Sequence, residues 1–479
     1  ESVMASVIEK TIRKAVTPAI QAVASLNRTR LQSEDANPFL HGVHEPLREE
    51  HTLTELAVTG AIPAELDGRY VRIGPNPHGS AGRGHHWFLG DGMVHGVRLR
   101  DGRAEWYRNR FIRSRDLEAK GGPAAVGGPR RGFGDTVNTN VLDIGGKIMA
   151  LVEASSFPVE LDGGLDSVAY SDFGGGLTGS FTAHPHRCPR TGEFHAICYE
   201  GTLQDTIRHV AMDASGKVLR ETPIKVRNGP SIHDCALTEN FVVILDLPVT
   251  FSMSALIAGH RFPYRWNREH RARVGLLPCG ASGDAVVWHE VDPCYVFHVG
   301  NSFEDQTGQV VIDLCAYKTI FDGEMPGPYG KALGLERWTV DGKGGKVVRT
   351  TIDPAGQEFP RPDERFFAGD YRYLWTMGMP EDGDLEFVAP MPLYRHDLAT
   401  GERVQRDFGE GRIPGEFVFV PRSEDAAEGD GWVMGYVIDR NCRTSALEIL
   451  DAMSLDLVAS VQIPHLIPPG FHGNWITAS

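Results

Sequence analysis

The chain has 479 residues, of which 41% are hydrophobic, so it can bury a large core. Its 48 Lys and Arg against 63 Asp and Glu give a formal net charge of −15, which argues against a nucleic-acid partner because nucleic acids bind basic surfaces. The 55 glycines and 30 prolines indicate many turns, as in a chain of many short strands.

Cysteine usage and hydropathy favour a cytoplasmic protein. The seven cysteines are scattered, form no CxxC pair and are odd in number, so we expect no disulfide framework. No apolar run approaches the roughly 20 residues of a membrane span, and no secretory signal stands out.

The N-terminal residues 1–50 differ from the rest of the chain. Residues 1–30 predict an amphipathic helix, and residues 31–50 a linker. The apolar positions of the predicted helix recur every three or four residues and are Ile8, Ile12, Val16, Ile20 and Val23. Such a helix either packs on the main domain or lies at a membrane interface, and both interpretations stay open.

Residues 51–479 predict one all-β domain. Gly- or Asn-containing turns separate β-rich runs, because these residues tolerate the positive φ that tight turns demand. The turns are Asp101-Gly102, Gly145-Gly146, Thr191-Gly192, Ser215-Gly216, Thr238-Glu239-Asn240 and Thr400-Gly401. No alternating strand–helix pattern appears, which disfavours a parallel α/β fold. The pattern alone leaves a sandwich pair, a jelly roll and a propeller open.

The apolar segment FSMSALIAG, residues 251–259, is compatible with a short helix. It is either buried against the domain or dips into a bilayer and accepts a lipophilic substrate.

Four of the 19 histidines lie at or beside the ends of predicted strands. They are His184, His233, His298 and His472, separated by 49, 65 and 174 residues. A local zinc motif would group its ligands closely, so these four need a fold that brings distant strands to one point, such as the axis of a propeller. Four neutral imidazoles suit iron, copper, zinc or nickel.

Ordered sequence blocks then identify a family. The chain resembles the carotenoid cleavage oxygenases from about Leu56 to Trp475. The blocks are DGRYVRIGPNP (67–77), HHWFLGDGMVHGV (85–97), NTNV (138–141), ALVEA (150–154), AHP (183–185), HDCALTENFVV (233–243), PCYVFHVGNSFED (293–305), EFPR (358–361), GEFVFVPR (415–422) and GFHGNW (470–475).

The resemblance implies a seven-bladed β-propeller with a helical and loop cap over an Fe(2+) site. It implies that the four histidines bind the iron, and that Glu153, Glu358 and Glu416 hold three of their rings while His184 lacks such a partner. Thr139 matches a small residue whose methyl group crowds one open iron position.

The implied reaction is oxidative cleavage of a C=C bond by O₂ to two aldehyde or ketone products. Stilbene-cleaving members carry a Lys before the first glutamate, where this chain has Val152, and a Tyr in a stretch corresponding to residues 121–135, which has none. A carotenoid or apocarotenoid is therefore the favoured substrate, with a stilbene as the alternative. A retinoid-isomerase-like activity and a non-catalytic carrier or interaction platform are further alternatives.

A lipophilic polyene also fits peripheral membrane contact through the N-terminal helix and residues 251–259. We expect no nucleic acid and no obligate protein partner.

Overall fold

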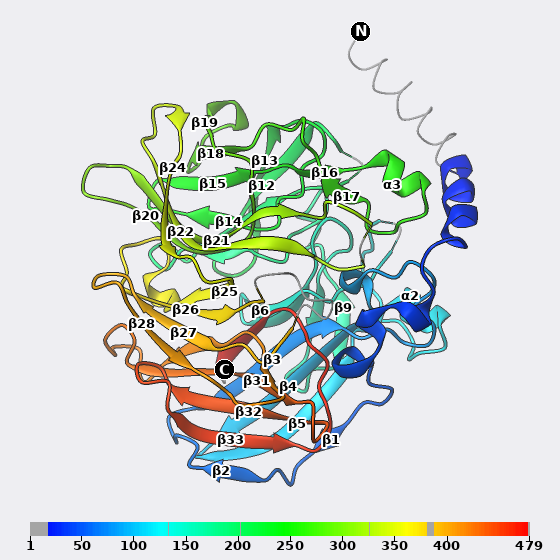
Figure 1. Cartoon of the computed structure of the whole chain (residues 1–479), viewed down its shortest axis with the longest axis vertical. Coiled ribbons are helices and arrows are strands. Elements are labelled where there is room, and N and C mark those ends of the chain that lie inside the picture. The colour runs from blue at the N-terminus through cyan, green and yellow to red at the C-terminus, as the bar shows by residue number, and fades with distance from the viewer. Residues whose placement is uncertain (1–17, 133, 202, 325, 381–387, 478–479) are drawn as a thin grey trace.

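Short strands joined by tight turns make up most of the chain (Figure 1). The computed structural model describes residues 18–132, 134–201, 203–324, 326–380 and 388–477. Within these residues the strands form seven sheets of four to six strands and one two-stranded sheet. The seven larger sheets follow one another as the blades of a β-propeller, so the predicted all-β, seven-bladed fold is confirmed.

The first three blades combine the N-terminal half of the chain with its last strand. Blade 1 contains β1 (Thr52–Leu53), β5 (Arg103–Phe111), β4 (Gly92–Arg100), β3 (Gly68–Pro75) and β34 (Gly473–Thr477). Blade 2 contains β6 (Asn140–Ile144), β7 (Lys147–Leu151), β8 (Val159–Leu161) and β9 (Ser167–Tyr170). Blade 3 contains β10 (His186–Arg187), β11 (Phe194–Cys198), β12 (Thr206–Met212) and β13 (Val218–Lys225).

The other four blades follow in chain order. Blade 4 contains β14 (Cys235–Leu237), β15 (Phe241–Asp246), β18 (Arg273–Pro278), β19 (Val287–Glu290) and β23 (Gly345–Lys346). Blade 5 contains β20 (Tyr295–Glu304), β21 (Val310–Ile320), β22 (Gly330–Val340) and β24 (Val348–Asp353). Blade 6 contains β25 (Gln357–Pro362), β26 (Tyr373–Gly378), β27 (Leu393–Asp397) and β28 (Glu402–Arg406). Blade 7 contains β2 (Val58–Gly60), β33 (Leu457–Ile463), β32 (Thr444–Asp451) and β31 (Gly431–Asp439), with β29 (Arg412–Pro414) and β30 (Val418–Pro421) both paired to β31.

The two ends of the domain interlock to close the ring. The C-terminal strand β34 completes blade 1 beside β3, and the N-terminal strand β2 completes blade 7 beside β33. Without these two strands, β3 of blade 1 and β33 of blade 7 would each have one unpaired edge.

Glycine turns with positive φ connect the strands of a blade, as predicted, whereas the turn Thr238-Glu239-Asn240 has no residue with positive φ. Asp101 and Gly102, with φ of 48° and 70°, join β4 to β5. The other turns named from the sequence likewise separate consecutive strands. Local turn chemistry thus fixes the hairpins.

The innermost strand of each blade lies next to those of its neighbours. These strands are β34, β6, β10, β14, β20, β25 and β30. Residues at the ends of these seven strands are therefore brought together at the centre of the propeller.

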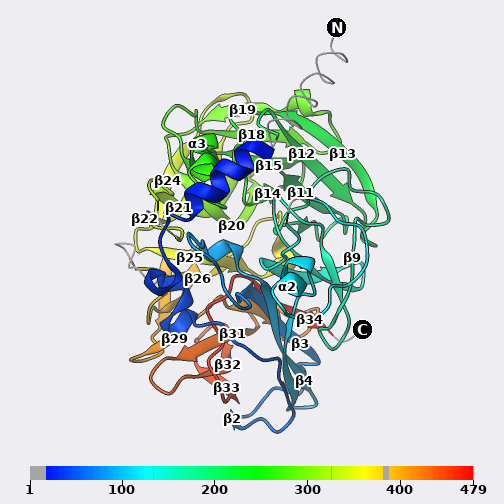
Figure 2. The same ribbon diagram turned by 90° about the vertical axis from the view of Figure 1, so that its right-hand side faces the viewer.

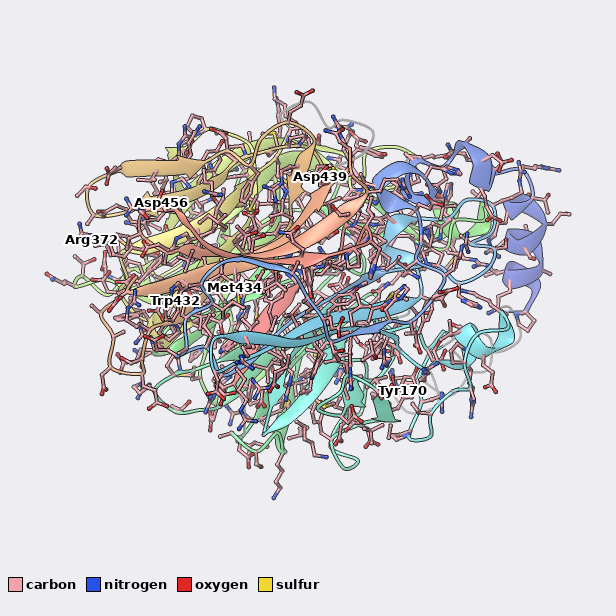
Figure 3. All side chains as sticks on the ribbon, turned by 90° about the horizontal axis from the view of Figure 1, so that it is seen from below. Tyr170, Arg372, Trp432, Met434, Asp439 and Asp456 are labelled. Atoms are coloured by element: carbon pink, nitrogen blue, oxygen red, sulfur yellow. The ribbon has the colours of Figure 1, made fainter. Side chains whose placement is uncertain are left out.

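The core lies between the blades. Trp432 and Met434 of β31 are 3% and 0% exposed, whereas Arg372 and Asp456 lie exposed at the outer edge (Figure 3). A blade strand covered on both faces reads as a continuous apolar run, which explains why alternation in the sequence did not reveal the blade count.

Helices gather on one side of the propeller, where residues 18–28 are helical and lie beside α3 (Met253–Ile257) (Figure 2). Asn27 Nδ2 donates to the Ile257 carbonyl (2.8 Å) and Arg28 Nε to the Gly259 carbonyl (2.9 Å). The short helix expected in 251–259 is thus present, and the two segments singled out for lipid contact pack on each other. Ile8, Ile12 and Val16 lie outside the described residues.

The remaining helical segments are short. They are α2 (Arg115–Ala119) and the 3-10 turns Glu34–Ala36, Pro38–Leu40, Gly42–His44, Trp87–Leu89, Gly283–Ala285 and Glu364–Phe366. The strands β16 (Val249–Phe251) and β17 (Tyr264–Trp266) form the separate two-stranded sheet, with α3 between them in the chain. No helix in the described part of the chain is long and apolar enough to cross a bilayer.

Candidate metal centre

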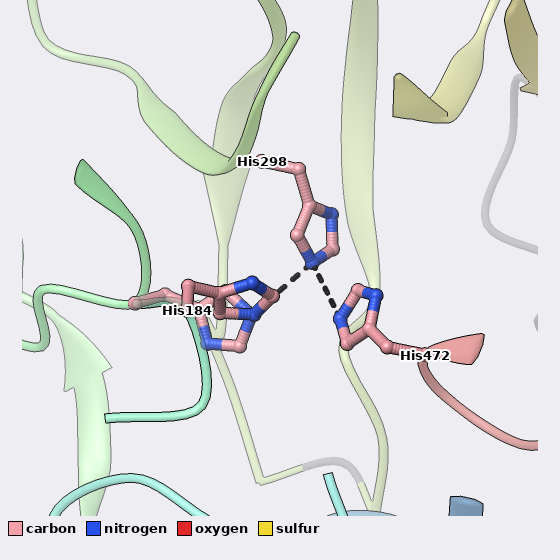
Figure 4. Close-up of side chains that lie close together, drawn as sticks. His184, His298 and His472 are labelled. Carbon is pink, nitrogen blue, oxygen red and sulfur yellow. Dashed lines mark hydrogen bonds between the residues drawn. The ribbon is translucent and has the colours of Figure 1, made fainter. Parts of the chain in front are cut away.

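Four histidines from four blades meet at the centre of the propeller (Figure 4). Nε2 of His233 lies 3.0 Å from Nε2 of His184 and 3.2 Å from Nε2 of His298. Nε2 of His298 lies 3.1 Å from Nε2 of His472. Their ligand atoms all lie within 4.8 Å of one another, so the four histidines form one group that can hold a metal ion.

Each blade supplies one residue to this centre at its inner strand, and blade 2 adds Glu153, which follows β7. In blade order the residues are His472, Thr139, His184, His233, His298, Glu358 and Glu416. Each lies within its inner strand or at most two residues before it. The propeller topology thereby converts positions scattered over most of the chain into one ring.

Three glutamates hold three of the four imidazoles. Glu153 Oε2 lies 2.8 Å from His233 Nδ1, and Glu358 Oε2 lies 2.5 Å from His298 Nδ1. Glu416 Oε1 lies 3.1 Å from His472 Nδ1. A carboxylate on Nδ1 keeps the proton there and leaves the Nε2 lone pair toward the centre. Among the described residues no carboxylate bonds His184.

Burial keeps two of the rings neutral. It lowers the pKa of His184 well below its usual value, and the other three imidazoles add to the effect. Burial also lowers the pKa of His472, against the opposing effect of Glu416. At His298 burial acts in the same direction, but Glu358 outweighs it and raises the pKa. Neutral imidazoles are the form that binds metal ions.

Glu416 has a second cationic partner in Arg361. Nη1 of Arg361 donates to Glu416 Oε1 (3.1 Å) and to the Gly473 carbonyl (3.0 Å). Burial alone would raise the pKa of Glu416, but Arg361 and His472 hold it at about 2. Glu416 is therefore a carboxylate at neutral pH although it is only 2% exposed.

Further polar contacts tie the inner strands to one another next to the histidines. Asp234, directly after His233, accepts from Val299 N (2.8 Å), directly after His298. His186 Nε2 lies 2.6 Å from Asp234 Oδ1. These bonds link blades 3, 4 and 5 within two residues of three of the four rings.

His186 and Asp234 also form, with Cys235, a second group whose atoms could hold a metal ion. Burial raises the pKa of Cys235 well above its usual value, so its thiol stays protonated. Asp234 already accepts from Cys235 N, Val299 N and His186. This group belongs to the scaffold that holds the four histidines.

Asparagines continue the contacts around the ring. Asn474, two residues after His472, donates to Asn140 Oδ1 (3.0 Å) and the Val141 carbonyl (2.8 Å). Asn140 in turn donates to the Ala183 carbonyl (2.8 Å), which precedes His184. Blades 1, 2 and 3 are thereby joined.

Thr139 lies beside the histidines and lines the same cavity. Its hydroxyl donates to Asn138 Oδ1 (2.9 Å), while its carbonyl accepts from His472 N (3.2 Å). The proton of the Thr139 hydroxyl is thus used in a hydrogen bond within the protein.

A cavity of about 1600 Å³ leads to the histidines. Aromatic rings form much of its wall, among them Phe88, Phe262, Phe297, Phe359 and Phe471. Phe297 contacts His233 at 5.3 Å between ring centroids, and Phe359 contacts His298 at 5.4 Å. The centre therefore lies at the wall of a large, mostly apolar chamber.

Comparison with known proteins identifies the family. The model of the retinal pigment epithelial membrane protein family matches residues 44–477. A carotenoid cleavage oxygenase of Mycobacterium tuberculosis is 38% identical over 93% of this chain and 99% of its own length. The chain belongs to the carotenoid cleavage oxygenase family.

Other members of the family differ in the substrates that their names give. Resveratrol cleavage oxygenase 1 of Aspergillus fumigatus is 31% identical over 92% of this chain and 95% of its own length. The crystal structure of the lignostilbene dioxygenase of Pseudomonas brassicacearum has the same fold, with a TM-score of 0.83 at 24% identity over 92% of this chain and 99% of that one. This carotenoid cleavage oxygenase family member is thus an enzyme of the oxygenase class.

Several residues of the centre were not predicted. They are Arg361, Asp234 and Asn474, which lie inside the recognised blocks. The local sequence does not indicate their hydrogen-bond partners, because these partners come from other blades.

Glu416→Gln should weaken metal affinity by about 10–100-fold, because it removes the carboxylate that holds His472. Equilibrium titration with Co²⁺, followed by absorbance, measures this. Glu448→Gln is the matched control, since Glu448 is 1% exposed, lies on β32 of the same blade and pairs with Arg412. Equal affinities for the two variants would contradict a role for Glu416 at the centre.

Asp234→Ala should lower the free energy of unfolding of the metal-free protein by about 3–5 kcal/mol, because it leaves two buried N–H groups and His186 without their acceptor. Urea denaturation followed by tryptophan fluorescence measures the change. Asp305→Ala, which removes a similar acceptor from a turn at the surface of blade 5, should cost less. A wild-type midpoint for Asp234→Ala would refute the structural role.

Proposed function

We propose that this chain is a non-haem Fe(2+) dioxygenase that cleaves a C=C bond of a carotenoid or apocarotenoid with O₂. The observation that carries the proposal is the convergence of four histidine Nε2 atoms at the wall of an aromatic cavity. Both atoms of O₂ enter the products, so one alkene and one O₂ give two carbonyl compounds and the reaction balances.

The donor set fits Fe(2+). Three of the Nε2–Nε2 distances are 3.0, 3.1 and 3.2 Å, so these nitrogens are close enough together to bind one ion. His184, His233, His298 and His472 would hold the ion, and the three glutamates would offset its charge. Bound iron would supply the activation of O₂. Imidazole alone does not choose the metal, so iron rests on the family.

The protein's own part is orientation and exclusion of water. Phe297 and Phe359 lie against rings of the centre and present apolar faces to a polyene. Thr139, at the start of β6, would restrict one approach to the ion through its methyl group. Apolar side chains around the reacting bond exclude water and so prevent side reactions with it.

The size of the cavity supports a long substrate. Its volume of about 1600 Å³ exceeds the roughly 300–1,000 Å³ of ordinary ligand pockets. Val152 lines the cavity where stilbene-cleaving relatives carry a Lys, so a phenol-binding ammonium is missing there. The alternative, cleavage of a stilbene, gains support from the 31% identical resveratrol cleavage oxygenase.

Delivery of such a substrate favours contact with a membrane surface. Four exposed apolar side chains lie on the two helices beside the cavity mouth: Val23 (47%), Leu26 (64%), Met253 (43%) and Ile257 (38%). Ile20, Ala24, Met253 and Leu256 of the same helices line the cavity. We propose that this surface rests on lipid and lets a polyene pass directly into the cavity.

Iron-loaded protein supplied with O₂ should convert a C40 carotenoid or an apocarotenal into paired carbonyl fragments, identified by mass spectrometry. His298→Ala should abolish this activity, because it removes one of the four donors. His209→Ala, at a buried histidine of β12, should retain activity. Cleavage of a hydroxystilbene alone would establish the alternative, and an active His298→Ala enzyme would sink the assignment of the centre.

Leu26→Ser combined with Ile257→Ser should reduce co-sedimentation with phosphatidylcholine vesicles several-fold, because two apolar contacts with lipid are lost. Leu457→Ser is the control, since Leu457 is 42% exposed on β33, away from the cavity mouth. Unchanged vesicle binding by the double variant would remove the proposed surface.

A further inference from the structure

Three of the tyrosines near the metal centre differ in what their hydroxyls do. Tyr199 and Tyr295 both use theirs within the protein: Tyr199 Oη lies 3.0 Å from Ser231 Oγ, and Tyr295 Oη donates to the Ser231 carbonyl (3.2 Å). Tyr264 is 7% exposed, and its hydroxyl has no hydrogen-bond partner among the described residues. The ring is therefore buried while the hydroxyl is open to the cavity, where a bound ligand can be its partner.

The free hydroxyl belongs to the cavity that leads to the histidines. Tyr264 and Tyr199 both line it. Tyr317 lines it too, but its hydroxyl is fully buried beside Glu358 rather than at the cavity surface. Tyr264 therefore offers the cavity a hydroxyl that the protein does not itself use.

The surroundings fix the Tyr264 ring. It begins β17, pairs with Phe251 of β16, and contacts Phe262 at 5.5 Å and Tyr199 at 5.8 Å between ring centroids. A side chain at Gly201 would place its Cβ 2.9 Å from the Tyr264 hydroxyl. A glycine there leaves room beside the hydroxyl, and the aromatic neighbours hold the ring in place.

The hydroxyl is a donor at any physiological pH. Burial raises the pKa of Tyr264, and the carboxylates of Glu153 and Glu200 add to the effect. Glu200 is itself engaged, since it pairs with Arg131 and accepts from Ser180 N (2.9 Å). Neither the carboxylate of Glu153, which holds His233, nor that of Glu200 bonds the Tyr264 hydroxyl.

We propose that the Tyr264 hydroxyl donates a hydrogen bond to an oxygen atom of the substrate, and that the enzyme selects oxygen-bearing substrates over hydrocarbons. This inference rests on the proposed function and refines its substrate class. The shared chemistry is a hydroxyl or carbonyl oxygen on an otherwise apolar, conjugated molecule. Such an oxygen belongs either to the end group of a carotenoid or apocarotenoid or to the phenol of a stilbene.

Tyr264→Phe tests the proposal because it removes only the hydroxyl. We would measure kcat/KM for a C40 hydrocarbon carotenoid, its dihydroxylated counterpart and a hydroxystilbene. The preference for the dihydroxylated carotenoid over the hydrocarbon should fall about fivefold to tenfold, the range expected for one neutral hydrogen bond. A loss confined to the stilbene would instead assign the subsite to a phenol. An unchanged preference between the two carotenoids together with an unchanged kcat/KM for the hydroxystilbene would overturn the proposal.

Tyr199→Phe is the matched control. Tyr199 lines the same cavity and is 4% exposed, but its hydroxyl is already bonded to Ser231. Its removal should leave the preference between oxygenated and hydrocarbon substrates unchanged. A loss of preference equal to that of Tyr264→Phe would mean that the effect comes from packing, and would also overturn the proposal.

Binding without turnover separates this inference from the proposed function. Quenching of tryptophan fluorescence by each polyene, measured on metal-free protein without O₂, gives dissociation constants that do not depend on catalysis. Tyr264→Phe should weaken binding of the dihydroxylated carotenoid fivefold to tenfold and leave the hydrocarbon unaffected. If the wild-type protein cleaves none of the substrates, the proposed function fails, while this ratio still decides the role of Tyr264.

Discussion

Closure of the propeller is the constraint on which the centre depends. Seven inner strands lie side by side, and each carries one residue of the centre within it or at most two residues before it. Moving one blade by a single residue would turn its inward residue to the other face of the strand. The pairing of β34 with β3 in blade 1 therefore does two things at once: it closes the ring and delivers His472 to the other three histidines.

The buried charges near the histidines follow from the same geometry. Four imidazole rings bind a cation together only if their Nε2 lone pairs point inward, and carboxylates on Nδ1 favour that orientation for three of them. The buried carboxylates of Glu358 and Glu416 would be costly without partners. Glu416 has Arg361 and His472, and Arg361 also bonds the backbone of blade 1. Charge compensation and the joining of blades are thus performed by the same side chains.

What the sequence could predict divides along local and tertiary lines. Turn chemistry is local, so pairs such as Asp101-Gly102 predicted the hairpins correctly. The blade count was accessible only by resemblance, because strands buried on both faces lose the alternation that distinguishes strand faces. The convergence of the histidines was likewise an implication of the family.

The partners of Asp234, Arg361 and Asn474 could not be predicted. Asn474 bonds a residue 334 positions away, and no local pattern encodes such a contact. The unpaired hydroxyl of Tyr264 is a tertiary property of the same kind. In the sequence Tyr264 resembles Tyr199 and Tyr295, and only the position of Ser231 relative to each ring separates them.

The arrangement also reconciles two opposing demands on the cavity. A polyene needs apolar walls, and the reacting bond needs exclusion of water, so phenylalanines surround the centre. Apolar walls alone discriminate poorly between substrates, since a methylene or an added hydroxyl changes binding little in such a pocket. A single fixed donor among aromatic rings adds discrimination at little cost in dryness, because only substrates that bring an oxygen satisfy it. The inner strands position the histidines, whereas Tyr264 on β17 and Gly201 lie in the cavity wall, outside those seven strands.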